Sequence, residues 1–338
     1  MIFNTNILFN LFTLHAIVLS LIFYGCSNNN LKSEVVHDDS TTSKSNQLSE
    51  ILKSDEWEAP DTSFIPKNDS GNLIRYGRAL VVRTSEYFGP NGKVKPIANG
   101  MNCQNCHLNA GTKLYANSFS AVYSIYPKLR ARSGTIEYLE KRINDCLERS
   151  LNGKKLDSLS KEMRAMVAYI NWVGKNVEKG VIPKGASVVD PPFLDRAADK
   201  EKGIIAFRKH CVSCHGDNGQ GKLNSDSITY LYPPLWGPNS YNTAAGLYRL
   251  SRIAGFIKSN MPNLTSSFEK PTLTDEEAWD VAAYISSMPR PDKKFKNDWP
   301  DISKKPFDHP FGPFSNNFSE IQHKYGPFKE IIEASKNK

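Results

Sequence analysis

Two C-x-x-C-H motifs contain the residues of this sequence whose types and spacing are best suited to chemistry. They are Cys103-Gln104-Asn105-Cys106-His107 and Cys211-Val212-Ser213-Cys214-His215. Two thiols one helical turn apart can form thioethers with the vinyl groups of a haem, and the adjacent histidine then reaches the iron from the same turn. Each motif therefore predicts one covalently bound haem c, with His107 or His215 as an axial ligand of the iron.

Paired C-x-x-C motifs also occur in structural zinc sites, where Cys103, Cys106, Cys211 and Cys214 would be the four ligands. That interpretation gives no role to the histidine that follows each motif. Two covalently bound haem c groups account for both histidines, and this is the interpretation that the sequence favours.

A further cysteine, Cys146, has no partner with which it could form a disulfide bond. Four of the six cysteines belong to the haem motifs, and Cys26 follows an apolar N-terminal run. When Tyr169 is aligned with Tyr284, Cys146 lies 23 residues before the first tyrosine and Met261 lies 23 residues before the second. We therefore predict that Cys146 is the second axial ligand in the first haem module, and that Met261 has this role in the second.

Other methionines and one lysine also lie near these positions. Met163 and Met166 fall inside the helix expected to close the first module, where packing in the core is the expected role. Met288 follows the closing helix of the second module, which places it away from the iron, and Lys258 is expected to be solvated. Met261 therefore remains the predicted ligand.

A thiolate ligand lowers the reduction potential of a haem relative to His/Met ligation, and a cysteine that can leave the iron becomes a nucleophile. If residues 136–150 form a helix, Arg142 lies four residues before Cys146 and Ser150 four after it, on one face. A guanidinium there would hold an oxyanion and favour the thiolate. Further basic residues crowd the same stretch, namely Lys128, Arg130, Arg132, Lys141, Arg149, Lys154 and Lys155. Of these, Lys128, Lys141 and Lys155 are expected to be solvated.

These residues are embedded in two copies of one helical module. A helix-like run precedes each motif, at 75–82 and at 202–207, although a stretch rich in Gly, Asn and Pro at 89–102 separates the first run from its motif. A closing helix is expected at 160–170 and at 274–285, because each segment opens with an N-cap residue and an acid in the first turn. Helix, haem motif, ligand loop and closing helix predict a mainly α fold with two tandem cytochrome c-like haem domains.

Composition gives the boundaries of these domains. After residue 290, prolines alternate with Phe and Trp, which prevents a long helix and also argues against disorder. We expect an irregular strap there that packs its rings over the haem domains. The predicted parts are a lipoprotein-type signal segment (1–25), a flexible tether (26–54), an N-terminal cytochrome c domain with the active site (55–174), a linker (175–199), a C-terminal cytochrome c domain for electron transfer (200–290) and a wrapping tail (291–338).

The N-terminus predicts an exported protein. The apolar run 7–24 is followed by Gly25-Cys26, which is typical of a lipoprotein signal with Cys26 as the acylated residue and the membrane anchor. The alternatives are an ordinary signal peptide and an uncleaved anchor, and all three readings place the protein in the periplasm or at the cell surface. The net charge of +8 suits small anions, and no dense Lys/Arg stripe interleaved with aromatic residues indicates a nucleic-acid partner.

The sequence around Cys146 resembles that of the dihaem thiosulfate dehydrogenases, which form tetrathionate. The resemblance is carried in order by residues 105–108, 142–153, 194–199, 260–262, 289–293, 298–301 and 324–328. It implies that thiosulfate binds at the first haem, that Cys146 forms a transient sulfur adduct, and that Arg132, Arg142 and Ser150 help to hold the substrate. Some relatives use a lysine at the second haem, whereas Asn260 precedes the ligand methionine here, so a lysine switch at that position is not expected.

The resemblance and the motifs together predict an oxidoreductase that joins two thiosulfate dianions into tetrathionate, or reduces tetrathionate in the reverse direction. The haem ligated by His107 and Cys146 would be the reaction site. The haem ligated by His215 and Met261 would exchange electrons with an external cytochrome c-type partner. Two alternatives stay open at this point: a dihaem electron carrier in which Cys146 is an incidental buried thiol, and a haem-cysteine thiosulfate sulfurtransferase.

Overall fold

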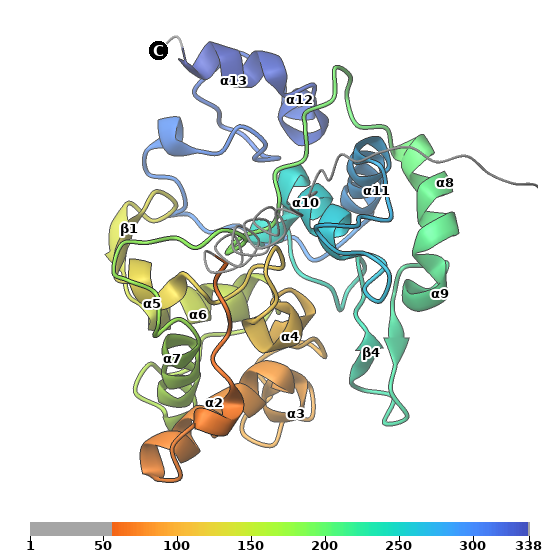
Figure 1. The fold of residues 1–338 in the computed structure, drawn as a ribbon. Helices are drawn as coiled ribbons and strands as arrows, with labels where there is room; N and C mark the ends of the chain where they lie inside the picture. The colour runs from red at the N-terminus through yellow and green to blue at the C-terminus, as the bar shows by residue number, and fades with distance from the viewer. Residues whose placement is uncertain (1–55, 337–338) are drawn as a thin grey trace, which may run out of the picture. The chain divides into compact units, whose positions relative to one another are not determined.

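The computed structural model describes residues 56–336, and Figure 1 shows how their helices and strands are arranged. The expected signal segment, the tether and Cys26 lie outside the described residues. Within residues 56–336, no helix is both long enough and apolar enough to cross a membrane.

The first haem module is built on three long helices, α2 (Asp69–Val82), α6 (Leu139–Arg149) and α7 (Lys161–Val173). An antiparallel hairpin of two short strands, β1 (Lys128–Arg130) and β2 (Thr135–Glu137), leads into α6. The remaining elements are η1 (Thr62–Phe64), α3 (Thr84–Phe88), η2 (Cys103–Asn105), α4 (Leu108–Gly111) and α5 (Val122–Ile125). The first C-x-x-C-H motif therefore begins on η2 and ends just before α4.

The second haem module repeats this plan with α8 (Lys200–His210), α10 (Leu250–Asn260) and α11 (Asp275–Ser287) as its long helices. The segment between α7 and α8 contains neither helix nor strand, as expected of a linker. The second motif runs from the end of α8 through α9 (Val212–His215). Shorter elements complete the chain: β3 (Lys222–Leu223), β4 (Tyr230–Tyr232), η3 (Gly246–Tyr248), η4 (Ile302–Lys304), α12 (Glu320–Tyr325) and α13 (Lys329–Lys336).

Each module is closed by a pair of helices that cross at a glycine. A Cβ atom built on Gly77 of α2 would lie 2.8 Å from the Cβ of Tyr169 on α7, and one built on Gly203 of α8 would lie 2.9 Å from the Cβ of Tyr284 on α11. Both positions are also within 2.0 Å of a backbone oxygen of the facing helix, so only a residue without a side chain permits the contact. The two tyrosines occupy matching places, which confirms the alignment of the two modules.

The predicted starts of the closing helices are also confirmed. The hydroxyl oxygen of Ser160 accepts a hydrogen bond from the N–H of Met163 at 3.2 Å. Thr274 accepts from the N–H of Glu277 at 3.1 Å, and the Glu277 carboxylate accepts from the N–H of Thr274 at 3.0 Å. The second pair is a capping box, which satisfies N–H groups that an α-helix leaves unpaired at its start.

A separate hydrophobic core stabilises each module. The first lies between α2, α6 and α7, and its most buried side chains include Leu80, Val81, Leu147, Met163, Met166 and Tyr169. The second is centred on α11 and includes Phe207, Leu250, Trp279, Val281 and Ala282. Met163 and Met166 are 0% and 2% exposed, so the predicted packing role of these methionines is confirmed.

The C-terminal tail packs on both modules and is less irregular than predicted. Phe328 and Ile331 are buried in the core of the second module, whereas Asp298 forms an ion pair with Arg149 of the first. Residues 314–326 and 328–338 contain no proline, and α12 and α13 form within these stretches. The tail is thus irregular only up to the beginning of α12.

Candidate active site

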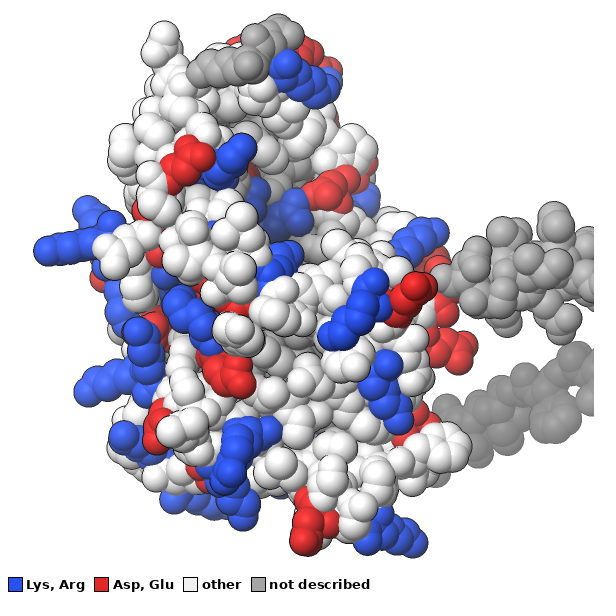
Figure 2. All heavy atoms as spheres, turned by 90° about the vertical axis from the view of Figure 1, so that its left-hand side faces the viewer, with Lys and Arg blue, Asp and Glu red and all other residues white. Residues whose placement is uncertain are grey.

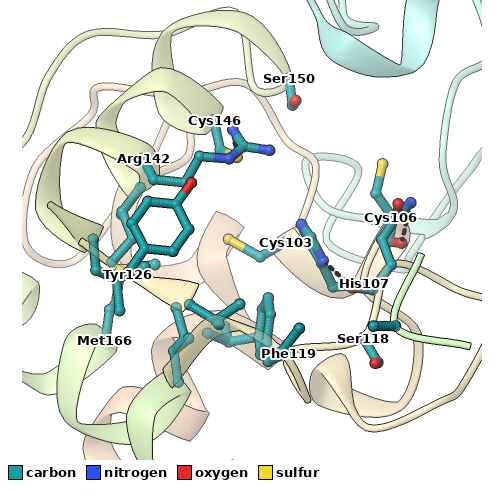
Figure 3. A pocket seen from close by; sticks show the side chains of 18 of the residues that line it. Cys103, Cys106, His107, Ser118, Phe119, Tyr126, Arg142, Cys146, Ser150 and Met166 are labelled. Carbon is teal, nitrogen blue, oxygen red and sulfur yellow. Dashed lines mark hydrogen bonds between the residues drawn. The ribbon is translucent and has the colours of Figure 1, made fainter. Parts of the chain in front are cut away.

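A cavity of about 380 Å³ opens in the first module between the C-x-x-C-H motif and helix α6. Cys103, Cys106 and His107 line it from the motif, and Cys146 lines it from α6. Figure 3 shows Cys103, His107 and Cys146 around a common space, with Arg142 beside Cys146. The predicted proximal histidine and the predicted second ligand of the first haem are therefore in the same cavity.

Both motif histidines are held by a backbone carbonyl. Nδ1 of His107 lies 2.6 Å from the carbonyl oxygen of Asn117, and Nδ1 of His215 lies 2.8 Å from that of Pro233. Because a carbonyl oxygen can only accept, each Nδ1 carries the proton, and each Nε2 has the lone pair with which an imidazole binds a metal. Burial lowers the pKa of His215, which keeps this imidazole in the neutral form that binds iron.

The side chains around the cavity are those that a haem c requires. All cysteines of the described residues are free thiols, so the motif cysteines are available for thioether bonds. Burial raises the pKa of Cys103 to about 11 and that of Cys106 to about 12. The two cysteine pairs pack against different cores, Cys103 against the first and Cys211 against the second, so the structure does not bring four thiols together for zinc.

Cys146 differs from the motif cysteines in its electrostatic surroundings. Burial alone would raise the pKa of its thiol, but the guanidinium of Arg142 and the side chain of His107 outweigh burial and lower the pKa to about 7. Nη1 of Arg142 donates to the Cys146 sulfur at 3.1 Å. The cavity thus contains one thiol that is ready to become a thiolate and nucleophile, or an anionic iron ligand.

Helix α6 brings Arg142, Cys146 and Ser150 to one face, as their spacing predicts. Ser150 is the C-cap residue of α6, its N–H donates to the carbonyl of Cys146 at 2.8 Å, and its side chain lines the cavity. In Figure 3, Arg142 and Ser150 lie on the Cys146 side of the cavity, across from Phe119.

Lys128 and Arg130 of strand β1, which the sequence counted among the basic residues near Cys146, also line the cavity, although Lys128 was expected to be solvated. They alternate with Leu129, whose side chain is 68% exposed, so one face of the strand turns toward the cavity. Nη1 of Arg130 donates to the hydroxyl of Tyr126 at 3.1 Å, and Tyr126 lines the cavity as well. The alternation of polar and apolar residues in Lys128-Leu129-Arg130 is the signal that could have identified this strand and the face that it turns toward the cavity.

Arg132, which the family resemblance placed near the substrate, is not among the residues that line the cavity. It sits at the tip of the β1–β2 hairpin, where Nη1 donates to the carbonyl of Ala244 at 3.0 Å and the guanidinium lies 5.3 Å from the centre of the Trp299 ring. Burial and the neighbouring Arg149 lower the pKa of Arg132 to about 10. The structure therefore does not group Arg132 with Arg142 and Ser150.

The predicted ligand Met261 follows α10 as its C-cap residue and packs, partly buried, against the second core. Lys258, the competing side chain, is tied elsewhere: its Nζ donates to the carbonyl of Leu273 at 2.9 Å and lies 2.9 Å from Asp275. Nδ2 of Asn260 donates to the carbonyl of Tyr115 in the first module at 2.9 Å.

Charge on the outer surface differs from charge in the cavity. On the side where Figure 1 shows β1 and α5, Lys and Arg are spread over the surface with Asp and Glu between them (Figure 2). The cavity lining, in contrast, contains Lys128, Arg130 and Arg142 and no carboxylate. Cations without a carboxylate among them are therefore a feature of the cavity lining and not of this face of the outer surface.

Comparisons with known proteins agree with this organisation. Residues 93–178 match the family model described as SoxA/TsdA, cytochrome c domain, and residues 201–289 match the cytochrome c model. The chain also resembles a solved structure of thiosulfate dehydrogenase (TsdBA) from Marichromatium purpuratum in its as-isolated form, with a TM-score of 0.66 and 29% identity. That match covers 74% of this chain but 53% of the other, so this chain spans about half of its length. The prediction of two tandem cytochrome c domains is confirmed.

Two curated relatives show the family to which this chain belongs. The thiosulfate dehydrogenase of Psychrobacter arcticus is 38% identical over 245 residues, which are 72% of this chain and 71% of that protein. The thiosulfate dehydrogenase of Allochromatium vinosum is 38% identical over 237 residues, which are 69% of this chain and 83% of that protein. This chain, with its two cytochrome c domains, belongs to the thiosulfate dehydrogenase family.

Proposed function

We propose that this protein oxidises thiosulfate, joining two thiosulfate dianions into tetrathionate, with Cys146 as the catalytic nucleophile. The observation that carries the proposal is the cavity of the first module. It places a thiol with a lowered pKa among three cations, Lys128, Arg130 and Arg142, and has no carboxylate in its lining. This combination suits a substrate that is a multiply charged anion and that reacts through sulfur.

The cations have two tasks in such a reaction. All three compensate the charge of the substrate, and Arg142 also reduces the repulsion between the thiolate and a dianion, which would otherwise oppose the formation of a sulfur–sulfur bond. Arg142 touches the thiol directly, at 3.1 Å, while Lys128 and Arg130 approach from the hairpin. The Ser150 hydroxyl adds a hydrogen-bond donor for a sulfonate oxygen.

The reaction proceeds through a bond to Cys146. The Cys146 thiolate and the outer sulfur of one thiosulfate form an S–S bond, a step that releases two electrons. The outer sulfur of a second thiosulfate then attacks that same substrate sulfur, the bond to Cys146 breaks, and the cysteine leaves as a thiolate. Tetrathionate results, and Cys146 is regenerated.

Cys103, Cys106 and His107 in the first module, and Cys211, Cys214 and His215 in the second, would each hold one haem c, and the two haems would supply two one-electron acceptors for the pair of electrons. Cys146 and Met261 would complete the sets of side chains that hold the two irons. We further propose that a separate cytochrome c-type protein takes up the electrons, and that export and a lipid on Cys26 place the enzyme in the periplasm or at the cell surface.

The first test uses the purified, haem-loaded protein with thiosulfate and ferricyanide, measuring the ferricyanide reduced and the tetrathionate formed. One tetrathionate for every two electrons is the expected result. The Cys146→Gly variant should lose turnover while retaining both haems. Its matched control is Lys155→Gln, which changes an exposed residue outside the cavity and should retain turnover.

Two results would contradict the proposal. Full haem loading without turnover, with the optical and magnetic spectra of the first haem unchanged in Cys146→Gly, would indicate an electron carrier. Consumption of thiosulfate without tetrathionate, dependent on an added acceptor protein, would indicate a sulfurtransferase.

A further inference from the structure

We propose that residues 295–300 of the C-terminal tail form a brace that positions the substrate-binding cations of the β1–β2 hairpin relative to Cys146. This inference rests on the proposed function, because it assigns the hairpin cations to the substrate. The brace lies outside the cavity lining and contacts two elements that contribute to it, the hairpin and helix α6.

At one end, the brace holds the tip of the hairpin. The backbone N–H of Trp299 donates to the carbonyl of Arg132 at 2.6 Å, and the Trp299 ring lies under the Arg132 guanidinium. Gly134, with a φ of +69°, approaches Pro300 so closely that an added Cβ would lie 2.7 Å from the proline Cγ. The tip is therefore fixed by a hydrogen bond, a cation–π contact and direct packing.

At its other end, the brace holds the helix that carries Cys146. Asp298 accepts two hydrogen bonds from Arg149, at 2.6 Å from Nη1 and 2.8 Å from Nη2. Arg149 lies three residues after Cys146, is only 5% exposed, and has the ring of Phe295 3.8 Å from its guanidinium carbon. A buried, forked ion pair of this kind fixes both position and orientation.

The hairpin needs such support because it has little core of its own. Two-stranded hairpins are marginally stable alone, and here the directly paired Leu129 and Ile136 are 68% and 66% exposed. Lys128 and Arg130 stand on the other face of β1 and line the cavity. A shift of the tip would therefore be passed along β1 to these two cations, while Cys146, on α6, would stay in place.

The test compares Trp299→Leu with the natural chain, both as haem-loaded protein. We expect the KM for thiosulfate to rise about 10-fold while kcat changes less than about 3-fold, because the change displaces binding groups and leaves the nucleophile in place. Hydrogen exchange of a peptide spanning residues 126–138 should become faster, and that of α8 should not change. Trp299→Phe, which retains a ring beside Arg132, should restore both values.

A double-mutant cycle with Lys128→Gln separates positioning from a general loss of stability. If Trp299 acts by positioning Lys128, Trp299→Leu changes the KM much less in the Lys128→Gln background than in the natural chain. If the two effects on KM simply multiply, the proposal is wrong. Phe314→Leu is the control in the same tail, because its ring stacks on His323 away from the hairpin, and its KM should be unchanged.

Two further measurements distinguish a failure of the brace from misfolding of the variant and from a failure of the proposed function. Should Trp299→Leu not fold, Gly134→Ala displaces the same contact from the hairpin side and must produce the same rise in KM and in exchange. Should the natural protein not oxidise thiosulfate, hydrogen exchange alone decides whether the brace orders the hairpin. Normal thiosulfate turnover with unchanged KM and exchange in Trp299→Leu would overturn the brace and leave the proposed function intact.

Discussion

Replacing Arg142 with glutamine tests directly whether the cation beside Cys146 stabilises the reacting sulfurs. Its guanidinium is 3.1 Å from the Cys146 sulfur, and no carboxylate of the cavity lining competes for it. A hydrogen bond to a charged group contributes about 1.5–3 kcal/mol, and two unit charges 4 Å apart at a protein surface interact by about 4 kcal/mol. We expect a loss of about 3 kcal/mol of transition-state stabilisation, which is about a 100-fold fall in kcat/KM for thiosulfate.

The assay is steady-state ferricyanide reduction at neutral pH, with haem content and thermal unfolding measured on each variant. Arg142→Lys is the informative comparison, since it retains the charge and loses the planar fork. We expect its kcat/KM to fall about 10-fold, between the natural protein and Arg142→Gln. The exposed Lys155→Gln removes one charge outside the cavity and should change kcat/KM less than about 2-fold.

The reasoning would be refuted if Arg142→Gln retained kcat/KM within about 3-fold of the natural protein at normal haem content, because the measured effect would then be below that of one charge-assisted hydrogen bond. Equal losses in Arg142→Lys and Arg142→Gln would mean that the geometry of the guanidinium matters and its charge does not.

Three further predictions concern stability and haem content. Gly203→Ala should lower the free energy of unfolding by about 2–3 kcal/mol in chemical denaturation, because the new Cβ would lie 2.0 Å from a backbone oxygen of α11. Gly246→Ala is the control and should be nearly neutral, because a Cβ added there would have no atom within 4 Å. Burial and Lys305 lower the pKa of His309 from 6.5 to about 4. Because the unfolded chain therefore takes up this proton at a higher pH than the folded protein does, the free energy of unfolding should fall by at most about 3 kcal/mol as the pH drops from about 6.5 to about 4. His309→Gln should flatten this pH profile in denaturant titrations. Cys214→Ser should roughly halve the covalently bound haem in a pyridine haemochrome assay while the first haem is retained.

Local spacing was sufficient to predict one half of the candidate site. Arg142, Cys146 and Ser150 are four residues apart, and on a helix this spacing alone brings them to one face. The closing helices were equally predictable, because Ser160 and Thr274 end the preceding loops with side chains that cap the first turn.

The hairpin half of the site depends on contacts that no local pattern contains. Lys128 and Arg130 reach the cavity because the strand is folded back before α6, and its tip is fixed by Trp299, more than 160 residues further along the chain. The same long-range contact holds Arg132 at the tip and away from the cavity. A count of basic residues near Cys146 in the sequence therefore could not tell the cations inside the cavity from those outside it.

The different surroundings of Cys146 and Met261 fit the roles that we propose for the two modules, reaction in the first and electron transfer in the second. Cys146 lies within α6, so residues four before and four after it stand around the thiol, and Arg142 is one of them. Met261 instead follows the last residue of α10, and Pro262 prevents the helix from continuing past it. The residue four before Met261 is Ile257, which is 5% exposed and packs in the core. The second module thus has an apolar side chain at the place where the first has Arg142, which suits the thioether ligand proposed there, whereas the first module has a guanidinium on its reactive thiol.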